Sequence, residues 1–285
     1  MISNKINDKF SAVHLLRDDE SASFRHLWST VFGDSEKVIN DFIHAWGDEI
    51  SIYVISTMSG EVTSSLCQFK LGTLNGKDVL VSYAICTNEG KRNNGLASAL
   101  TIHAKDVAIL QNAVSILSPA SPSLVSFYEK LGYKPAFYAT KKEWIMPASS
   151  NASSDLPQSE CKKLTSGEYN TLRENILNNI PHVTLSDNAI NYIASYSEFY
   201  ESKSTGAICC VENNSSSVSE LLYKNMKDIN NAKPFLLPKT LSEQPTEYLI
   251  PTTIDTISDA FVHGMIAGEN LANDEILPWL GFAFE

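Results

Sequence analysis

The chain has 285 residues, of which 43% are hydrophobic and 19% charged. This composition is typical of a folded protein with a substantial core and excludes disorder for most of the sequence. The 22 Lys and Arg residues are outnumbered by 33 Asp and Glu residues, which gives a formal net charge of −11. Such an excess of acidic groups argues against a protein that binds nucleic acid by neutralising phosphates.

The cysteines and histidines show no metal-binding pattern. None of the five cysteines lies in a CxxC pair, and the six histidines include no HExxH motif, so we expect no metal. An odd number of cysteines also does not suit a disulfide framework, which favours a reducing, cytoplasmic location. The N-terminal residues are polar, and no run of about 20 apolar residues occurs. We therefore expect neither secretion nor a membrane partner.

A Ser-rich segment divides the sequence almost in half. Residues 147–160 (PASSNASSDLPQSE) contain two prolines and no apolar periodicity, which is typical of a linker. We expect one domain over residues 1–146 and a smaller one over residues 161–285. The first domain has 14 basic and 15 acidic residues, whereas residues 147–285 have 8 and 18. The acidic second half either attracts a cationic partner or only solvates its own surface.

The first half alternates helical and strand patterns. Apolar side chains recur at spacings of three and four in the expected helices, which cover residues 21–32, 35–46, 95–111 and 122–131. Runs rich in β-branched residues, bounded by turn signals at Ser59–Gly60 and Asn75–Gly76, predict strands over residues 50–56, 62–71, 78–86 and 114–117. This order predicts an α/β domain with a mixed sheet.

The second half begins with a similar order of elements. We expect helices over residues 166–180 and 187–200, then strands over residues 206–211 and 218–223. Residues 278–285 alternate apolar side chains in the manner of a strand. The order of two helices followed by strands repeats the first half, which suggests a decayed internal duplication.

The most informative segment is residues 84–100, AICTNEGKRNNGLASAL. A strand leads into a loop of Gly and Asn residues, and a helix begins at the end of this loop. The first backbone amides of a helix are unpaired and lie at the positive end of its dipole, so they bind anions. Gly and Asn adopt the left-handed dihedrals that let successive amides converge on one anion, and Arg92 adds a positive charge beside them. A diphosphate suits such a site.

Two motifs in this half resemble those of the GCN5-related N-acetyltransferase (GNAT) superfamily. Residues 92–97, RNNGLA, are similar to its (Arg/Gln)-x-x-Gly-x-(Gly/Ala) signature, with a strand before and a helix after. Residues 127–133, FYEKLGY, resemble its F-Y-E-K-L-G-F segment. The resemblance covers about residues 20–146. It implies the GNAT fold, an α/β (α+β) arrangement with a mixed, mostly antiparallel central sheet flanked by helices.

The resemblance implies a site for acetyl-CoA. Its pyrophosphate would lie on the backbone amides of the RNNGLA motif, which comprises Arg92, Asn93, Asn94, Gly95, Leu96 and Ala97. Ile85 and Thr87 would pair their main chains with the pantetheine arm where the central strands separate. Ser121 stands where many relatives have an asparagine that contacts the cofactor. Asn93 and Asn94 replace the commoner Gly-x pair, which Asn tolerates because it also adopts positive φ.

The implied reaction is direct transfer of an acetyl group to a primary amine of a small molecule or peptide. The oxyanion of the intermediate would be held by a strand amide, and Tyr128 would protonate the departing thiolate. No general base is assigned, because Asp78 at a hairpin end suits a solvated carboxylate and Glu89 suits a role in ordering the loop. Two alternatives are a non-catalytic acyl-CoA sensor with the same fold and a partner-binding protein that has lost the cofactor.

The second half is similar to the degenerate second domain of bacterial two-domain GNAT proteins. It has no Arg/Gln-x-x-Gly-x-Gly/Ala motif, and the segment after its second expected strand, KNMKDINNAK, has no glycine. We expect it not to bind acetyl-CoA in the same way. In some relatives the chain end enters the active site, which would place Glu285 there; a strand with a frayed end is the simpler expectation. A homodimer is expected because dimers are common.

Overall fold

The computed structural model describes residues 9–143, 161–213, 217–226, 237, 247–271 and 276–282. The predicted linker at residues 147–160, most of the KNMKDINNAK segment and Glu285 lie outside these ranges. The chain forms two compact units. Unit 1 contains Met1–Pro135 together with Gly264–Asn270, and unit 2 contains Ala136–His263 together with Leu271–Ala283.

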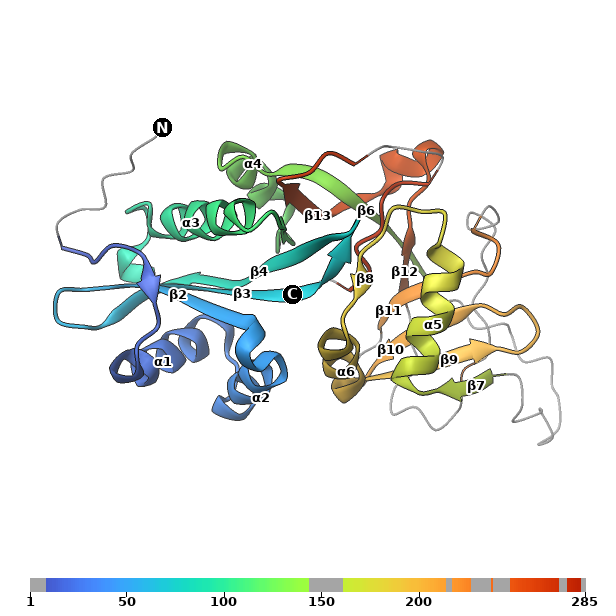
Figure 1. The fold of residues 1–285 in the computed structure, drawn as a ribbon, viewed down its shortest axis with the longest axis horizontal. Helices are drawn as coiled ribbons and strands as arrows, with labels where there is room; N and C mark the ends of the chain where they lie inside the picture. The colour runs from blue at the N-terminus through green and yellow to red at the C-terminus, as the bar shows by residue number, and fades with distance from the viewer. Residues whose placement is uncertain are drawn as a thin grey trace. The chain divides into compact units, whose positions relative to one another are not determined.

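The helices of unit 1 lie close to the predicted ranges. They are α1 (Ser21–Phe32), α2 (Glu36–Trp46), α3 (Leu96–Leu110) and α4 (Pro122–Lys130). Helix α1 ends at Gly33, whose φ of +80° suits a glycine. Helices α1 and α2 lie on one side of strands β2 to β4 and α3 lies on the other (Figure 1).

The sheet of unit 1 is mostly antiparallel. Its strands, in spatial order, are β1 (His14–Leu15), β2 (Ile50–Ser56), β3 (Val62–Leu74), β4 (Lys77–Thr87), β5 (Val114–Leu117) and β13 (Phe261–Ala267). Each neighbouring pair is antiparallel except β4 and β5, which are parallel. The predicted mixed, mostly antiparallel sheet flanked by helices is confirmed.

The two faces of this sheet are packed differently. Leu66 and Phe69 are three positions apart on β3, so their side chains point to opposite faces. Leu66 belongs to an aliphatic cluster with Leu96 and Leu100 of α3. Phe69 stacks on Trp46 of α2 with ring centroids 4.1 Å apart. All five side chains are at most 2% exposed, so α3 and the site at its start rest on a closely packed sheet.

Unit 2 contains a second sheet with α5 (Ser166–Leu177) and α6 (Asp187–Tyr196). A two-residue strand, β8 (Thr184–Leu185), lies between these helices in sequence. The sheet strands, in spatial order, are β7 (Cys161–Leu164), β9 (Ser197–Ser202), β10 (Ile208–Glu212), β11 (Ser217–Leu222), β12 (Glu247–Pro251) and β6 (Lys134–Glu143).

Two predictions for the second half are wrong. The helix predicted to reach Tyr200 ends at Tyr196, and residues 197–202 form β9. Tyr192, Tyr196 and Tyr200 keep a helical spacing of four, but the burial of Phe199 and Tyr200 in the sheet prevails over it. The strand predicted over residues 278–285 is absent from its described part, which forms only an isolated bridge at Trp279 and turns at Gly281 with φ +84°.

The strands of the two units follow the same order of antiparallel and parallel pairing. The last strand of each series comes from the other half of the sequence. In both series of six strands the neighbours are antiparallel except for the fourth and fifth, β4 and β5 in unit 1 and β11 and β12 in unit 2. Strand β6 follows α4 in sequence but pairs with β12, whereas β13 follows β12 in sequence but pairs with β5. The predicted domains, residues 1–146 and 161–285, do not describe this exchange.

Candidate active site

Strand β4 contains a bulge at Ala84. Ser65 of β3 pairs with Cys86, and Cys67 pairs with Tyr83, so β4 has one more residue than β3 between these pairs. Ala84 takes up the extra residue with φ +51°, a left-handed conformation that is costly for alanine. A bulge bends the strand and redirects the backbone that follows, here Ile85 to Thr87.

Beyond this point β4 separates from β5. Their parallel pairing covers only Val79–Val81 with Val114–Ile116, although β4 continues to Thr87. The amide of Asn88 donates to Thr63 on β3 over 2.9 Å. Because successive amides along a strand point to opposite sides, those of Thr87 and Ile85 point away from β3. Among the described strands, none pairs with this side of β4, so an extended ligand chain can.

The loop after β4 is shaped by its Asn and Gly residues. The Asn88 side chain accepts a hydrogen bond from the Gly90 amide at 3.0 Å, and a single 3-10 turn covers Glu89–Lys91. The Asn94 side chain donates to the carbonyl oxygen of Lys91 at 2.9 Å. Asn93 has φ +65° and Gly95 has φ +74°, as the sequence predicted for these residue types.

These conformations leave a row of backbone amides open. Helix α3 starts at Leu96, and no side chain caps its N-terminus. The amide of Ala99 bonds to the carbonyl of Gly95 at 3.0 Å, and Arg92 bonds to Glu89 at 3.2 Å. Within the described part of the chain, the amides of residues 93–98 have no hydrogen-bond acceptor. Together with the dipole of a fifteen-residue helix and the exposed Arg92, they can bind a diphosphate.

Tyr128 lies near the end of α4 and is 7% exposed. Burial raises the pKa of its hydroxyl from 10.0 to about 12, so the group stays protonated at neutral pH. Its hydroxyl makes no hydrogen bond to a described residue. A protonated hydroxyl on a largely buried side chain, with no partner among the described residues, can serve as a proton donor to a ligand.

The remaining predicted residues are placed as follows. Ser121 is the N-cap residue of α4, but its hydroxyl bonds to Ser123 at 2.8 Å and does not cap the helix. Asp78 forms a partly exposed ion pair with Lys70 at 2.9 Å, and Glu89 is exposed. Both carboxylates are exposed, and neither lies in a closed site of the kind that holds a general base.

Sequence reasoning missed one contributor to this geometry, the bulge at Ala84. Nothing distinguishes Ala84 from other alanines in a strand, so its bulge was not foreseen. Asn88 lay within the predicted loop, and its position two residues before Gly90 is a recognisable turn signal. In the described ranges, no three His, Cys, Asp or Glu side chains come together as metal ligands.

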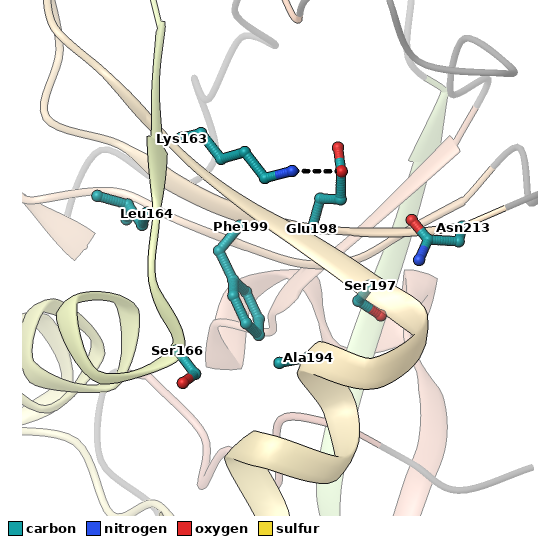
Figure 2. A pocket seen from close by; sticks show the side chains of 8 residues that line it. All are labelled: Lys163, Leu164, Ser166, Ala194, Ser197, Glu198, Phe199 and Asn213. Carbon is teal, nitrogen blue, oxygen red and sulfur yellow. Dashed lines mark hydrogen bonds and ion pairs between the residues drawn. The ribbon is translucent and has the colours of Figure 1, made fainter.

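A separate hollow of about 210 Å³ lies within unit 2 (Figure 2). It is bordered by residues of β7, α5, α6 and β9, and by Asn213. Its two charged side chains, Lys163 and Glu198, pair with each other at 2.5 Å. This hollow shares no residue with the loop, strand and helix described above.

Comparisons with known proteins agree with this geometry. Residues 12–136 match the family model described as an acetyltransferase (GNAT) domain. The fold is similar to that of a GCN5-related N-acetyltransferase from Kribbella flavida, with 10% identity and a TM-score of 0.60 over 90% of this chain and 70% of that one. A GCN5-related N-acetyltransferase from Anabaena variabilis gives 14% identity and a TM-score of 0.61 over 90% and 72%.

A search of proteins with curated descriptions found no match. None of the helices in the described ranges is long and apolar enough to cross a bilayer. The matched domain contains the bulged strand, the open amides and Tyr128, and the fold similarity extends over both units. Residues 12–136 therefore form an acetyltransferase (GNAT) domain, and the chain has the fold of the two GCN5-related N-acetyltransferases named above.

Proposed function

We propose that this protein is an N-acetyltransferase that moves an acetyl group from acetyl-CoA directly to a primary amine of a small molecule or peptide. The observation that carries the proposal is the row of open amides at residues 93–98, next to the unpaired edge of β4. A protein that had lost its cofactor would have no reason to keep these amides free.

The residues present fit acetyl-CoA. The amides of Asn93 to Ala97 and the guanidinium of Arg92 would hold the pyrophosphate. The main chains of Ile85 and Thr87 would pair with the amides of the pantetheine arm, in the way that a further strand would. Ser121 stays a candidate contact at the start of α4. When bound, acetyl-CoA supplies an activated acyl group and a thiol leaving group.

The chain's own groups then have distinct tasks. The bulge at Ala84 turns the following amides of β4 toward the open edge, where one of them can stabilise negative charge on the acyl oxygen. Tyr128 keeps its proton because of its raised pKa and can donate it from Oη to the thiolate as that group departs. Holding both substrates in one site supplies a large part of the rate enhancement.

The acceptor is proposed to be a cationic amine. The net charge of −11 favours the approach of cations over anions. If so, kcat/KM for spermidine should fall more steeply with added salt than kcat/KM for a neutral amine. Equal salt dependence would contradict the cationic acceptor without affecting acetyl transfer. All five cysteines are free thiols, which supports a cytoplasmic location because disulfides are rare in reducing compartments.

Calorimetric titration with acetyl-CoA tests the cofactor site. Gly95→Glu places a carboxylate beside the open amides, and we expect it to weaken binding about 100-fold or more. Gly95→Ala is the steric control, because no atom lies within 4 Å of the added Cβ. The strain of alanine at φ +74° should cost about 1 kcal/mol. The Kd for acetyl-CoA should therefore stay within about tenfold of the wild-type value. Gly167→Glu in unit 2, also free of neighbours, controls for charge and should have no effect.

Thiol release then tests catalysis. The wild type is assayed with spermidine, an aminoglycoside and a tripeptide as acceptors, and Tyr128→Phe is expected to lower kcat by about 100-fold with the affinity for CoA unchanged. Binding without thiol release from any acceptor would identify an acyl-CoA sensor. No binding of acetyl-CoA to the folded wild type would overturn the proposal.

A further inference from the structure

A buried hydroxyl pair joins the end of α4 to the sheet of unit 1. The hydroxyls of Tyr133 and Ser115 lie 2.8 Å apart. Tyr133 is 1% exposed and Ser115 is fully buried. Ser115 occupies the middle of β5, opposite Leu80 of β4, one position before the parallel pairing of the two strands ends.

This pair is not needed to fill the core. A phenylalanine at position 133 would fill the same space without burying a hydroxyl. The Ser115 hydroxyl would then have no partner, but an alanine at position 115 would remove that hydroxyl as well. Burying two hydroxyls gains little stability when they bond to each other and costs stability when either partner is lost.

Tyr133 is held firmly against Tyr128. Their rings meet edge to face with centroids 6.3 Å apart, and the amide of Tyr133 donates to the carbonyl oxygen of Tyr128 at 3.2 Å. Between them, Gly132 has φ +94°, which tightens the turn. The placement of the Tyr128 ring is therefore coupled to that of the Tyr133 ring.

We infer that Tyr133 is a positioning residue for Tyr128. Through Ser115 it anchors α4 to β5, and β5 pairs with the strand whose open edge would hold the acyl group. The contact chain from Tyr128 through Tyr133 and Ser115 to β4 sets where the Tyr128 hydroxyl stands relative to the thioester sulfur. This inference rests on the proposed acetyl transfer and assigns Tyr133 no contact with either substrate.

Kinetics of three variants test the inference. Tyr133→Phe and Ser115→Ala should each lower kcat for thiol release from acetyl-CoA about tenfold with spermidine, because a misplacement of about 1 Å can cost about 100-fold and these variants should move the proton donor by less than that. The Kd for CoA should stay within about twofold, since the amides of α3 are untouched. Tyr53→Phe is the matched control and should leave kcat unchanged, because it removes the hydroxyl of another largely buried tyrosine of unit 1, on the α3 face.

Two further measurements separate positioning from a general structural role. Adding Tyr133→Phe to Tyr128→Phe should lower kcat no further, because there is no proton donor left to position. Crystal structures with CoA should place the Tyr128 hydroxyl within hydrogen-bond distance of the sulfur in the wild type and farther away in Tyr133→Phe. An additive loss in the double variant, or an unmoved Tyr128, would overturn the inference.

The outcomes distinguish this inference from the proposed function. If the wild type releases thiol and loses rate in Tyr128→Phe but not in Tyr133→Phe, acetyl transfer stands and the positioning role is wrong. If spermidine is not an acceptor, the two crystal structures still decide the role of Tyr133. If the wild type does not bind CoA, both the function and the inference fail.

Discussion

Lys105 of α3 donates a hydrogen bond from Nζ to the carbonyl oxygen of Leu131, directly after α4, over 2.7 Å. Its side chain is only 17% exposed, so this charge-assisted bond is shielded from solvent. It fixes the end of the helix that carries Tyr128 to the helix that carries the open amides.

Replacing Lys105 with Met should therefore destabilise the protein. The loss of a hydrogen bond from a charged group to a partly buried carbonyl predicts a decrease of about 1.5–3 kcal/mol in the free energy of unfolding, measured by urea denaturation. Lys37→Met is the control, because Lys37 and its partner Asp41 are 83% and 59% exposed and the change should stay below about 0.5 kcal/mol. Equal stability of the two variants would show that Lys105 does not hold α4.

The raised pKa of Tyr128 predicts the pH profile of acetyl transfer. A hydroxyl with a pKa of about 12 remains almost fully protonated up to about pH 10, so the donor is not lost as the pH rises to that value. We expect kcat to show no decline from Tyr128 ionisation up to about pH 10. A decline centred between about pH 9 and 10 that disappears in Tyr128→Phe would contradict this assignment.

The left-handed conformation of Ala84 predicts opposite effects of two substitutions. Ala84→Gly should stabilise the protein by up to about 1 kcal/mol, because glycine adopts φ +51° without strain. Ala84→Val should destabilise it by about 2 kcal/mol and lower kcat, since a β-branched residue at positive φ favours straightening the bulge. Thermal unfolding measures both effects. A stabilised valine variant would mean that the bulge is not fixed at this residue.

The buried carboxylate of Glu20 predicts how the free energy of unfolding depends on pH in the acidic range. Burial alone would raise the pKa of Glu20, but hydrogen bonds from Ser56, His14 and the amide of Arg17 outweigh it and lower the pKa below its ordinary 4.5. A lowered pKa in the folded state means that stability is present above about pH 4.5 and is lost as the pH falls below it.

Glu20→Gln removes this contribution, so the variant should lose less stability than the wild type between about pH 5 and pH 3. Urea denaturation at several pH values within this range measures the difference. The other carboxylates remain in both proteins and cancel in the comparison. Parallel pH dependences would show that Glu20 is not stabilised as an anion.

Much of the site could be predicted because its signals are local. Gly95 and Asn93 adopt the left-handed conformations that their residue types favour, and the helix that follows needs only the apolar spacing of residues 96–110. Tyr128 could be singled out from its motif, although its burial and lack of a partner depend on the fold. The spacing of apolar residues was also sufficient for α1, α2 and most strands of unit 1.

The rest depends on contacts between residues distant in sequence. No local pattern places Ala267 opposite Ser115, and none indicates that β6 pairs with β12. The end of α6 at Tyr196 is decided by the sheet that Phe199 joins, since the local spacing of tyrosines favours a longer helix. The bulge at Ala84 is forced by the register with β3, which no single strand encodes.

The exchange of β6 and β13 also constrains the order in which the molecule can be assembled during synthesis. The sheet that supports the open amides is finished only when β13 has left the ribosome, after all the other strands have been made. Until then, β5 has an exposed edge that can pair with another chain. A nascent chain that stops short of β13 has the entire RNNGLA motif and Tyr128 but an incomplete sheet beneath them, so possession of the motif alone does not guarantee a working site.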